Sequence, residues 1–246
     1  MFPVNSFDMA ETKIADRVKG VDWRGAAKAI GAEGYARTGP LLSGSECAAL
    51  AVLYADDDIF RSRIDMARYR FGEGEYKYFA NPLPGIVGQL RTHLYRKLAP
   101  IANRMMADLG RKERYPASLS AYLKVCHKKK QTRPTPLMLR YQTGGYNCLH
   151  QDLYGDLRFP LQVTIGLSRP GTDYGGGEFL LVEQRPRAQS RGEAIQLEQG
   201  EAIIFPVAER PVAGKRGMHA CAMRHGVSRV RGGVRYALGI IFHDAA

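Results

Sequence analysis

The stretch Leu149-His150-Gln151-Asp152 organises this chain of 246 residues. His150 and Asp152 stand two positions apart, so on a β-strand their side chains leave the same face. An imidazole nitrogen and a carboxylate oxygen placed in this way can bind one metal ion. Two protein groups leave the coordination of that ion incomplete, and a further ligand must therefore come from another segment.

The C-terminal half of the chain predicts a β-rich structure around this stretch. From Gln131 onward, Pro134 and Pro136 break any helix, and short apolar segments alternate with glycine turns. The expected strands cover residues 137–141, 146–152, 161–167, 177–182, 194–197, 201–205, 218–224 and 234–242. Several short strands with regular turns are typical of a sandwich or a barrel.

The N-terminal half predicts mainly helices. Asp22 is placed to cap a short helix, and Ser43-Gly44-Ser45-Glu46 has the form of a capping box that opens another. Apolar residues at helical spacing predict a long helix over 83–110, which Pro100 should kink or split. A further helix is expected over 118–127.

No linker, repeat or low-complexity segment divides the chain. We therefore expect a single domain over residues 1–246, with a mainly helical N-terminal extension (1–130) and a β-rich core (131–246). The first 20 residues carry mixed charge and few large apolar groups, so we expect them to lie on the surface or to fray.

Aromatic and basic residues alternate in two neighbouring segments, Arg68-Tyr69-Arg70-Phe71 and Tyr76-Lys77-Tyr78-Phe79. The glycines between them predict two strands joined by a turn. Such a surface could stack bases and contact phosphates. A half-buried hairpin shows the same alternation, and it is the interpretation that we favour.

The composition bears on partners and location. The net charge is +12, and Lys and Arg in such excess favour a nucleic-acid partner, although a basic solvated surface is the simpler alternative. The chain has no apolar run long enough to span a membrane and no secretion signal at its start. Its four cysteines lie far apart, which predicts free thiols and a cytoplasmic protein.

A third metal ligand can be sought among the six histidines. Three of them are most simply explained by packing, surface or strand-end positions: His93, His127 and His243. His219 and His225 remain. We favour His225 because the strand that follows it carries Arg235 ten positions on, where a guanidinium can bind a carboxylate through two hydrogen bonds.

Two histidines and one carboxylate on one face of an octahedral ion form the arrangement used by non-haem Fe(II) in O₂ chemistry. An open Fe(II) site beside an arginine that binds carboxylates suits a chelating 2-oxo diacid. Zn²⁺ would favour a tetrahedral shell with more His or Cys ligands. A Zn or Mn site in a similar barrel, or purely structural histidines, are the alternatives to iron.

These motifs resemble the Fe(II)/2-oxoglutarate-dependent dioxygenases over residues 131–246. The run Arg140-Tyr141-x-x-Gly144, followed by His150-Gln151-Asp152, is similar to AlkB-type nucleic-acid demethylases. The segments 174–179 and 200–205, and His225-x-Val227-Ser228 with its later arginine, are similar to prolyl hydroxylases. More closely still, the whole chain resembles a bacterial family of 2-oxoglutarate oxygenases described as acting on damaged DNA.

The resemblance implies an α+β fold with a double-stranded β-helix (jelly-roll) core and N-terminal helices packed against one sheet. It implies that His150, Asp152 and His225 bind Fe(II) at the catalytic centre. Tyr141 and Arg235 would hold the cosubstrate 2-oxoglutarate, with O₂ as second cosubstrate. Oxidation of an N-methyl group in alkylated DNA or RNA would release formaldehyde, succinate and CO₂. A hydroxylase of a protein side chain, peptide or amino acid, and a non-catalytic cupin-like binding module, are the alternatives.

Overall fold

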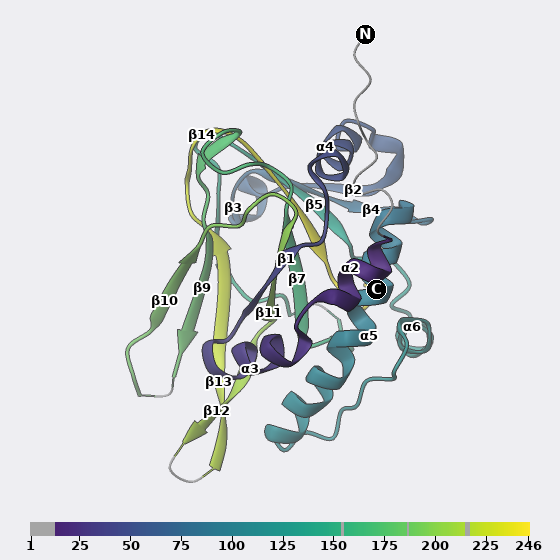
Figure 1. Ribbon diagram of the computed structural model, residues 1–246, viewed down its shortest axis with the longest axis vertical. Coiled ribbons are helices and arrows are strands. Elements are labelled where there is room, and N and C mark those ends of the chain that lie inside the picture. The colour runs from purple at the N-terminus through teal and green to yellow at the C-terminus, as the bar shows by residue number, and fades with distance from the viewer. Residues whose placement is uncertain (1–12, 154, 186, 215–216) are drawn as a thin grey trace.

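Two antiparallel sheets form the centre of the computed structural model, which describes residues 13–246 except 154, 186, 215 and 216 (Figure 1). The larger, eight-stranded sheet has the order β1 (Ala36–Pro40), β11 (Glu201–Pro206), β7 (Leu161–Gly166), β14 (Val230–Ile240), β5 (Leu137–Gln142), β4 (Glu75–Phe79) and β2 (Phe60–Asp65), with β8 (Tyr174–Gly176) paired to β14. The smaller, six-stranded sheet has the order β10 (Arg191–Ile195), β9 (Phe179–Gln184), β13 (Gly217–Val227), β6 (Tyr146–His150) and β3 (Gly72–Glu73), with β12 (Glu209–Gly214) paired to β13.

The helices gather on one side of the larger sheet (Figure 1). They are α2 (Ile14–Gly20), α3 (Trp23–Glu33), α4 (Gly44–Leu53), α5 (Gly85–Asp108) and α6 (Leu119–Lys128). Two short 3₁₀ helices, η1 (Asp57–Ile59) and η2 (Ala67–Tyr69), lie before and after β2. This is the α+β jelly roll with helices on one sheet that the sequence predicted. No helix in the part of the chain that the structure describes is long and apolar enough to cross a membrane.

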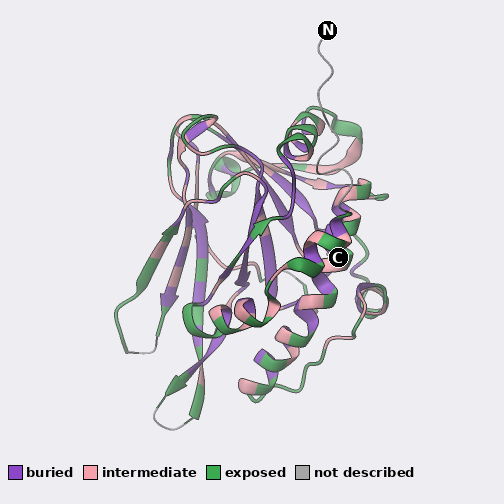
Figure 2. Ribbon diagram, in the orientation of Figure 1, coloured by how far each residue is buried: buried purple, intermediate pink, exposed green. Residues whose placement is uncertain are grey.

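The central strands β7 and β11 of the larger sheet are buried along nearly their whole length, as the colour in Figure 2 shows. Along β7, Leu161, Val163 and Ile165 belong to the core shared with the helices. The residues between them, Gln162 and Thr164, line a cavity between the sheets. Successive side chains of a strand point to opposite faces, so β7 sends apolar groups to the helices and polar groups inward.

Helix starts follow the sequence. The side chain of Asp22 accepts a hydrogen bond from the Gly25 backbone, Ser43 and Glu46 form the expected capping box, and Ser118 caps α6. The long helix α5 is not split: it continues through Pro100 as one element. Buried apolar side chains before and after the proline hold both segments of α5 against the core.

The segment 68–71 is not the strand that its alternation predicted. Residues 67–69 form η2, and Arg70 has the left-handed φ of 60°. The partner of β4 is instead β2, which sequence reasoning did not identify. Met66 is fully buried, and its carbonyl accepts hydrogen bonds from the backbone N–H groups of Tyr69 and Phe71, which folds the chain into a turn.

The start of the chain also differs from expectation. Residues 14–20 form α2, whose Ile14 and Val18 are four positions apart and buried in the core with α5. These residues are therefore not frayed: they form an ordered helix with one face packed on the core and the other exposed. Residues 1–12, which were also expected to fray or lie on the surface, are outside the described part of the chain. Each expected C-terminal strand has a counterpart, displaced by a few residues at its ends, but β8 and β12 were not predicted. That residues 1–246 form one domain stays our proposal, supported by β1, β2 and β4, which carry the sheet into the N-terminal half.

Candidate metal centre

An irregularity in β6 sets the direction of His150. On the neighbouring strand β13, His225 pairs with His150 and Val227 pairs with Asn147, so three steps along β6 oppose two steps along β13. Such a β-bulge re-aims side chains. Asn147 and His150 therefore line the same cavity although they are three positions apart, while Cys148 between them is exposed.

His150, Asp152 and His225 converge inside this cavity. The strand β6 ends at His150, so Asp152 lies in the following segment and not on the strand that was expected to carry both. Asp152 Oδ1 lies 3.5 Å from His150 Nε2, and its Oδ2 lies 3.4 Å from His225 Nε2. One ligand atom from each residue lies within 4.8 Å of the others, a spacing that one metal ion can bridge.

The two imidazoles are oriented for this task. His150 Nδ1 lies 2.8 Å from the Cys148 carbonyl, to which it can donate, and this leaves Nε2 free to bind a metal. His225 is buried between the rings of Phe179 and Phe205, whose centroids lie 6.0 and 4.8 Å from its own. Packing of this kind restricts the ring before any ion binds.

The remaining histidines lie elsewhere. His127 Nε2 lies 2.9 Å from Asp244, and the buried His243 accepts a hydrogen bond from the Phe159 backbone. His219, the rival third ligand, pairs with Val212 toward the far end of β13. Among the described residues, His150, Asp152 and His225 form the only group of three or more His, Cys, Asp or Glu side chains that could hold a metal ion.

The pKa shifts of Asp152 and His225 favour the protonation states in which these residues bind a metal ion. Burial alone would raise the pKa of Asp152, but hydrogen bonds from His150 and His225, together with their charges, hold it well below its ordinary value. Burial lowers the pKa of His225, which favours its neutral form. For His150, burial acts in the same direction, but the contact with Asp152 prevails and raises its pKa. A carboxylate and neutral imidazoles are the forms that bind metal ions.

The opposite wall of the cavity is built for an anion. Arg235 on β14 pairs in register with Tyr141 on β5, and its guanidinium carbon lies 5.6 Å from the Tyr141 ring centroid. Arg235 is only 2% exposed, and no carboxylate of the described residues pairs with it. Its Nε and the hydroxyl of Tyr141 are buried without a hydrogen-bond partner there. Burial raises the pKa of Tyr141, against the opposing effect of Arg235, so its hydroxyl stays a donor.

A buried cation without a counter-ion is costly, and unsatisfied donors beside it add to the cost. A small dicarboxylate bound in this cavity would satisfy both Arg235 and Tyr141. The cavity, of about 120 Å³, is also far smaller than the roughly 300–1,000 Å³ typical of pockets for drug-sized ligands. The residues present therefore fit Fe(II) on one wall and 2-oxoglutarate on the other.

Gln162 is a residue of this site that sequence reasoning missed. It is 5% exposed, and its amide Nε2 donates to Asp152 Oδ2 at 2.9 Å and lies 3.3 Å from His225 Nε2. The available signal was a glutamine in β7, a short strand that is mostly apolar and buried. A buried amide must find partners, and the partners of this one are two of the candidate ligands.

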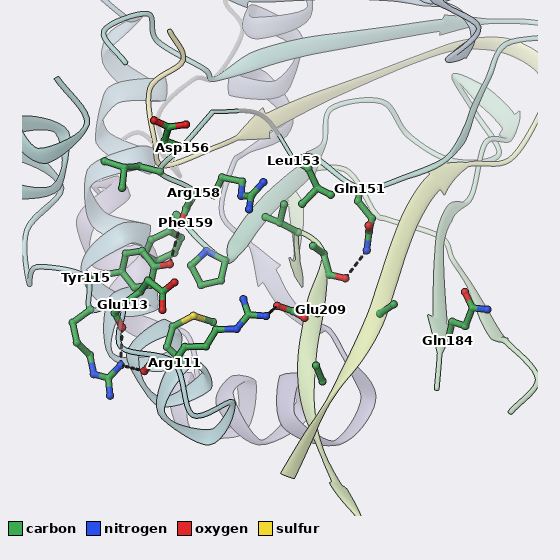
Figure 3. A pocket seen from close by; sticks show the side chains of 18 of the residues that line it. Arg111, Glu113, Tyr115, Gln151, Leu153, Asp156, Arg158, Phe159, Gln184 and Glu209 are labelled. Carbon is green, nitrogen blue, oxygen red and sulfur yellow. Dashed lines mark hydrogen bonds and ion pairs between the residues drawn. The ribbon is translucent and has the colours of Figure 1, made fainter. Parts of the chain in front are cut away.

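A larger groove lies outside the cavity, between the α5–α6 connection and the β12–β13 hairpin (Figure 3). Its volume is about 1350 Å³, and five arginines line it: Arg111, Arg114, Arg158, Arg185 and Arg187. Gln151 reaches this groove, where its amide donates to the carbonyls of Ala208 and Met223 at 2.6 and 2.9 Å. The residue between His150 and Asp152 is thus anchored on the groove side.

Solved structures share this architecture. A prolyl-4-hydroxylase from Pseudomonas putida superposes with a TM-score of 0.55 at 14% identity, covering 91% of this chain and all of that one. A 2OG-Fe(II) oxygenase family oxidoreductase from Burkholderia pseudomallei superposes with a TM-score of 0.54 at 15% identity, covering 98% and 96% of the two chains. At 14% and 15% sequence identity, this similarity shows a shared fold alone.

The fold and the lining of the cavity fit the class of 2-oxoglutarate-dependent Fe(II) oxygenases, oxidoreductases that use Fe(II) as cofactor and 2-oxoglutarate and O₂ as cosubstrates. Within that class, a family model described as "Oxygenase, catalysing oxidative methylation of damaged DNA" matches residues 74–245, and the chain belongs to this family. Membership favours an enzyme over the non-catalytic cupin-like module.

One relative is similar to this chain in sequence over about two thirds of its length. The uncharacterized protein Rv2227 of Mycobacterium tuberculosis is 57% identical over 168 residues, which cover 68% of this chain and 72% of that protein. Its description adds no activity.

Proposed function

We propose that this oxygenase removes methyl groups oxidatively from alkylated DNA or RNA, with His150, Asp152 and His225 as the ligands of Fe(II). The observation that carries the chemistry is the cavity itself, which has two histidines and a carboxylate on one wall and the unpaired Arg235 and Tyr141 on the other. An octahedral Fe(II) bound by three protein groups keeps positions open for cosubstrates.

Each residue has a role in this proposal. His150, Asp152 and His225 hold one face of the ion, while Arg235 and the Tyr141 hydroxyl bind the distal carboxylate of 2-oxoglutarate. When bound, Fe(II) with 2-oxoglutarate and O₂ supplies the oxidant for a substrate C–H bond. One oxygen atom of O₂ enters an N-methyl group and the other enters succinate as CO₂ leaves. The N-hydroxymethyl product then breaks its C–N bond to give N–H and formaldehyde.

Nucleic acid as the substrate class is supported by three observations. The family description names damaged DNA, and the chain carries a net charge of +12. In the groove beside the site, Arg111 and Arg185 are paired with Glu209 and Glu183, while Arg158 has no carboxylate partner within the described ranges. Free guanidinium groups on a basic surface favour phosphates.

The cavity is too small for a nucleotide beside the cosubstrate, so the methylated base must be presented at its mouth. Only a base that is single stranded or flipped out of the duplex can reach such a site. We place the enzyme in the cytoplasm on the strength of its four free cysteines.

The deciding experiment is formaldehyde release from an N-methylated single-stranded oligonucleotide with Fe(II), 2-oxoglutarate and O₂. We expect formaldehyde and succinate in equal amounts, none from the unmethylated oligonucleotide and none from His225→Ala. A second candidate is hydroxylation of a protein side chain or peptide, favoured by the His225-x-Val227-Ser228 pattern with Arg235. Absence of formaldehyde together with incorporation of one oxygen atom into a peptide pool would establish that candidate instead.

A further inference from the structure

We propose that Tyr69 and Phe71 form a stacking platform for an unpaired base of single-stranded nucleic acid at the mouth of the metal cavity. This inference rests on the proposed function and assigns the surface that receives its substrate. The platform consists of these two exposed aromatic residues of the turn that follows β2, together with Arg68 and Arg70, which alternate with them in the sequence.

The two rings are exposed, which is unusual for large aromatic groups. Tyr69 is 56% and Phe71 38% exposed, and the rings stack on each other with centroids 5.5 Å apart and planes 20° from parallel. Among the described residues, seven large hydrophobic side chains are exposed, and two others, Leu149 and Leu153, directly adjoin the candidate ligands in sequence. Exposed aromatic rings that pack on each other, as Tyr69 and Phe71 do, offer an apolar surface of the kind that binding sites use.

The pair lies beside the metal ligands. The Phe71 carbonyl accepts a hydrogen bond from Cys148 N at 2.8 Å, and Gly72 pairs with Asn147, so the turn is joined to the bulged strand that carries His150. The Phe71 side chain lines the same cavity as His150. A base stacked on this pair would therefore lie next to the open side of the site.

The turn is also ordered before any substrate binds. Met66 is fully buried, and its backbone donates to the Gly74 carbonyl at 2.9 Å while its own carbonyl accepts from Tyr69 N and Phe71 N. Arg70 takes the left-handed conformation that closes the turn. Aromatic groups held on such a turn lose little conformational entropy when a ligand stacks on them.

The positive charges around the two rings favour nucleic acid over uncharged aromatic ligands. The Arg68 side chain is 81% exposed and has only a 3.8 Å contact with Asp65, and Arg70 is exposed as well. Aromatic faces that stack bases, interleaved with cations that meet phosphates, are the common arrangement of single-strand binding surfaces. Stacking of this type tolerates any base, which suits an enzyme that must examine varied sequences.

The test measures binding and needs no turnover. Fluorescence anisotropy of a labelled, unmodified oligothymidylate is recorded with wild type and with Tyr69→Ala and Phe71→Ala. Base stacking is worth about 1–3 kcal/mol per base, so each variant should bind about 5- to 150-fold more weakly. Tyr69→Phe and Phe71→Tyr keep a ring and should bind as wild type does. Val52→Ala, at a 74% exposed apolar residue on α4, is the matched control. Circular dichroism checks that every variant is folded.

Arg68→Ala and Arg70→Ala supply an independent measurement. Each should reduce the slope of log affinity against log salt concentration by about 0.7, the value for one phosphate contact on a single strand. If Tyr69→Ala and Phe71→Ala fold and bind the oligonucleotide as tightly as wild type, the platform is refuted. Formaldehyde release by wild type would still support the proposed function in that case. If these variants bind weakly but wild type releases no formaldehyde, the platform stands and the demethylase does not. Aromatic-dependent binding of peptides in place of oligonucleotides would also overturn it.

Discussion

Replacing Gln162 with leucine should weaken metal binding without unfolding the protein. The amide of Gln162 donates to Asp152 Oδ2 at 2.9 Å, which leaves Oδ1 directed toward His150 Nε2, 3.5 Å away. Without this hydrogen bond the carboxylate can rotate away from the position between the two imidazoles. Leucine is close to glutamine in size, so the space that this side chain fills beside the cavity should stay filled.

The size of the effect follows from the contact that is lost. A hydrogen bond to a charged group contributes about 1.5–3 kcal/mol, equivalent to a change in affinity of roughly 10- to 150-fold. Loss of groups that orient metal ligands usually costs about 10- to 100-fold in metal affinity. We therefore expect the dissociation constant for Fe(II), or for Co(II) as a visible probe, to rise by about 10- to 100-fold in Gln162→Leu.

The assay is an anaerobic titration with Co(II), followed by its visible absorption, because it reports binding in the absence of turnover. Gln199→Leu is the matched control, since its amide donates to the Leu167 carbonyl at 3.0 Å, outside the metal cavity. Circular dichroism and thermal unfolding establish that both variants fold. Equal Co(II) affinities for wild type and a folded Gln162→Leu would refute the argument that this amide positions Asp152.

Three further results are expected. Arg235→Leu should raise the dissociation constant of 2-oxoglutarate by about 30- to 5,000-fold, because loss of a buried charge that binds a carboxylate costs roughly 2–5 kcal/mol. Calorimetry measures this constant, and an unchanged affinity would exclude Arg235 as the residue that binds the carboxylate. Fe(II) or Mn(II) at about 100 times its dissociation constant should stabilise the folded protein by roughly 2.7 kcal/mol and so raise Tm by about 5–10 °C. A similar rise in Tm for His225→Ala would argue against His225 as a metal ligand. Burial, together with the charge of Arg91, lowers the pKa of His243 to about 4. Between about pH 6.5 and 4, His243 therefore binds a proton in the unfolded chain but not in the folded protein. The free energy of unfolding should fall by up to about 3 kcal/mol as the pH drops through this range. Urea unfolding of wild type and His243→Gln tests this, and equal pH slopes would contradict it.

Sequence was sufficient for features that depend on residue type and short spacing. The pairs Asp22 with Gly25 and Ser43 with Glu46 form helix caps because the atoms involved lie within one turn of chain. The strands around His150 could be predicted because their glycine turns and apolar runs are local signals. His225 and Arg235 were selected by their separation along the chain and by their chemistry.

The tertiary structure decided which distant residues meet. Whether η2 or a strand forms at residues 67–69 depends on the burial of Met66, and the choice of β2 as the partner of β4 depends on long-range pairing. Neither follows from local propensity, because alternating aromatic and basic residues suit a strand and an exposed turn alike.

The sequence by itself was therefore sufficient to predict that His150, Asp152 and His225 bind a metal ion and that a β-rich core surrounds them. Only the tertiary structure decided that a bulge turns His150 inward, that Asp152 meets it from outside the strand, and that Gln162 holds the carboxylate. The physical reason is that the direction of a side chain depends on strand register, and register is set by packing between segments far apart in sequence.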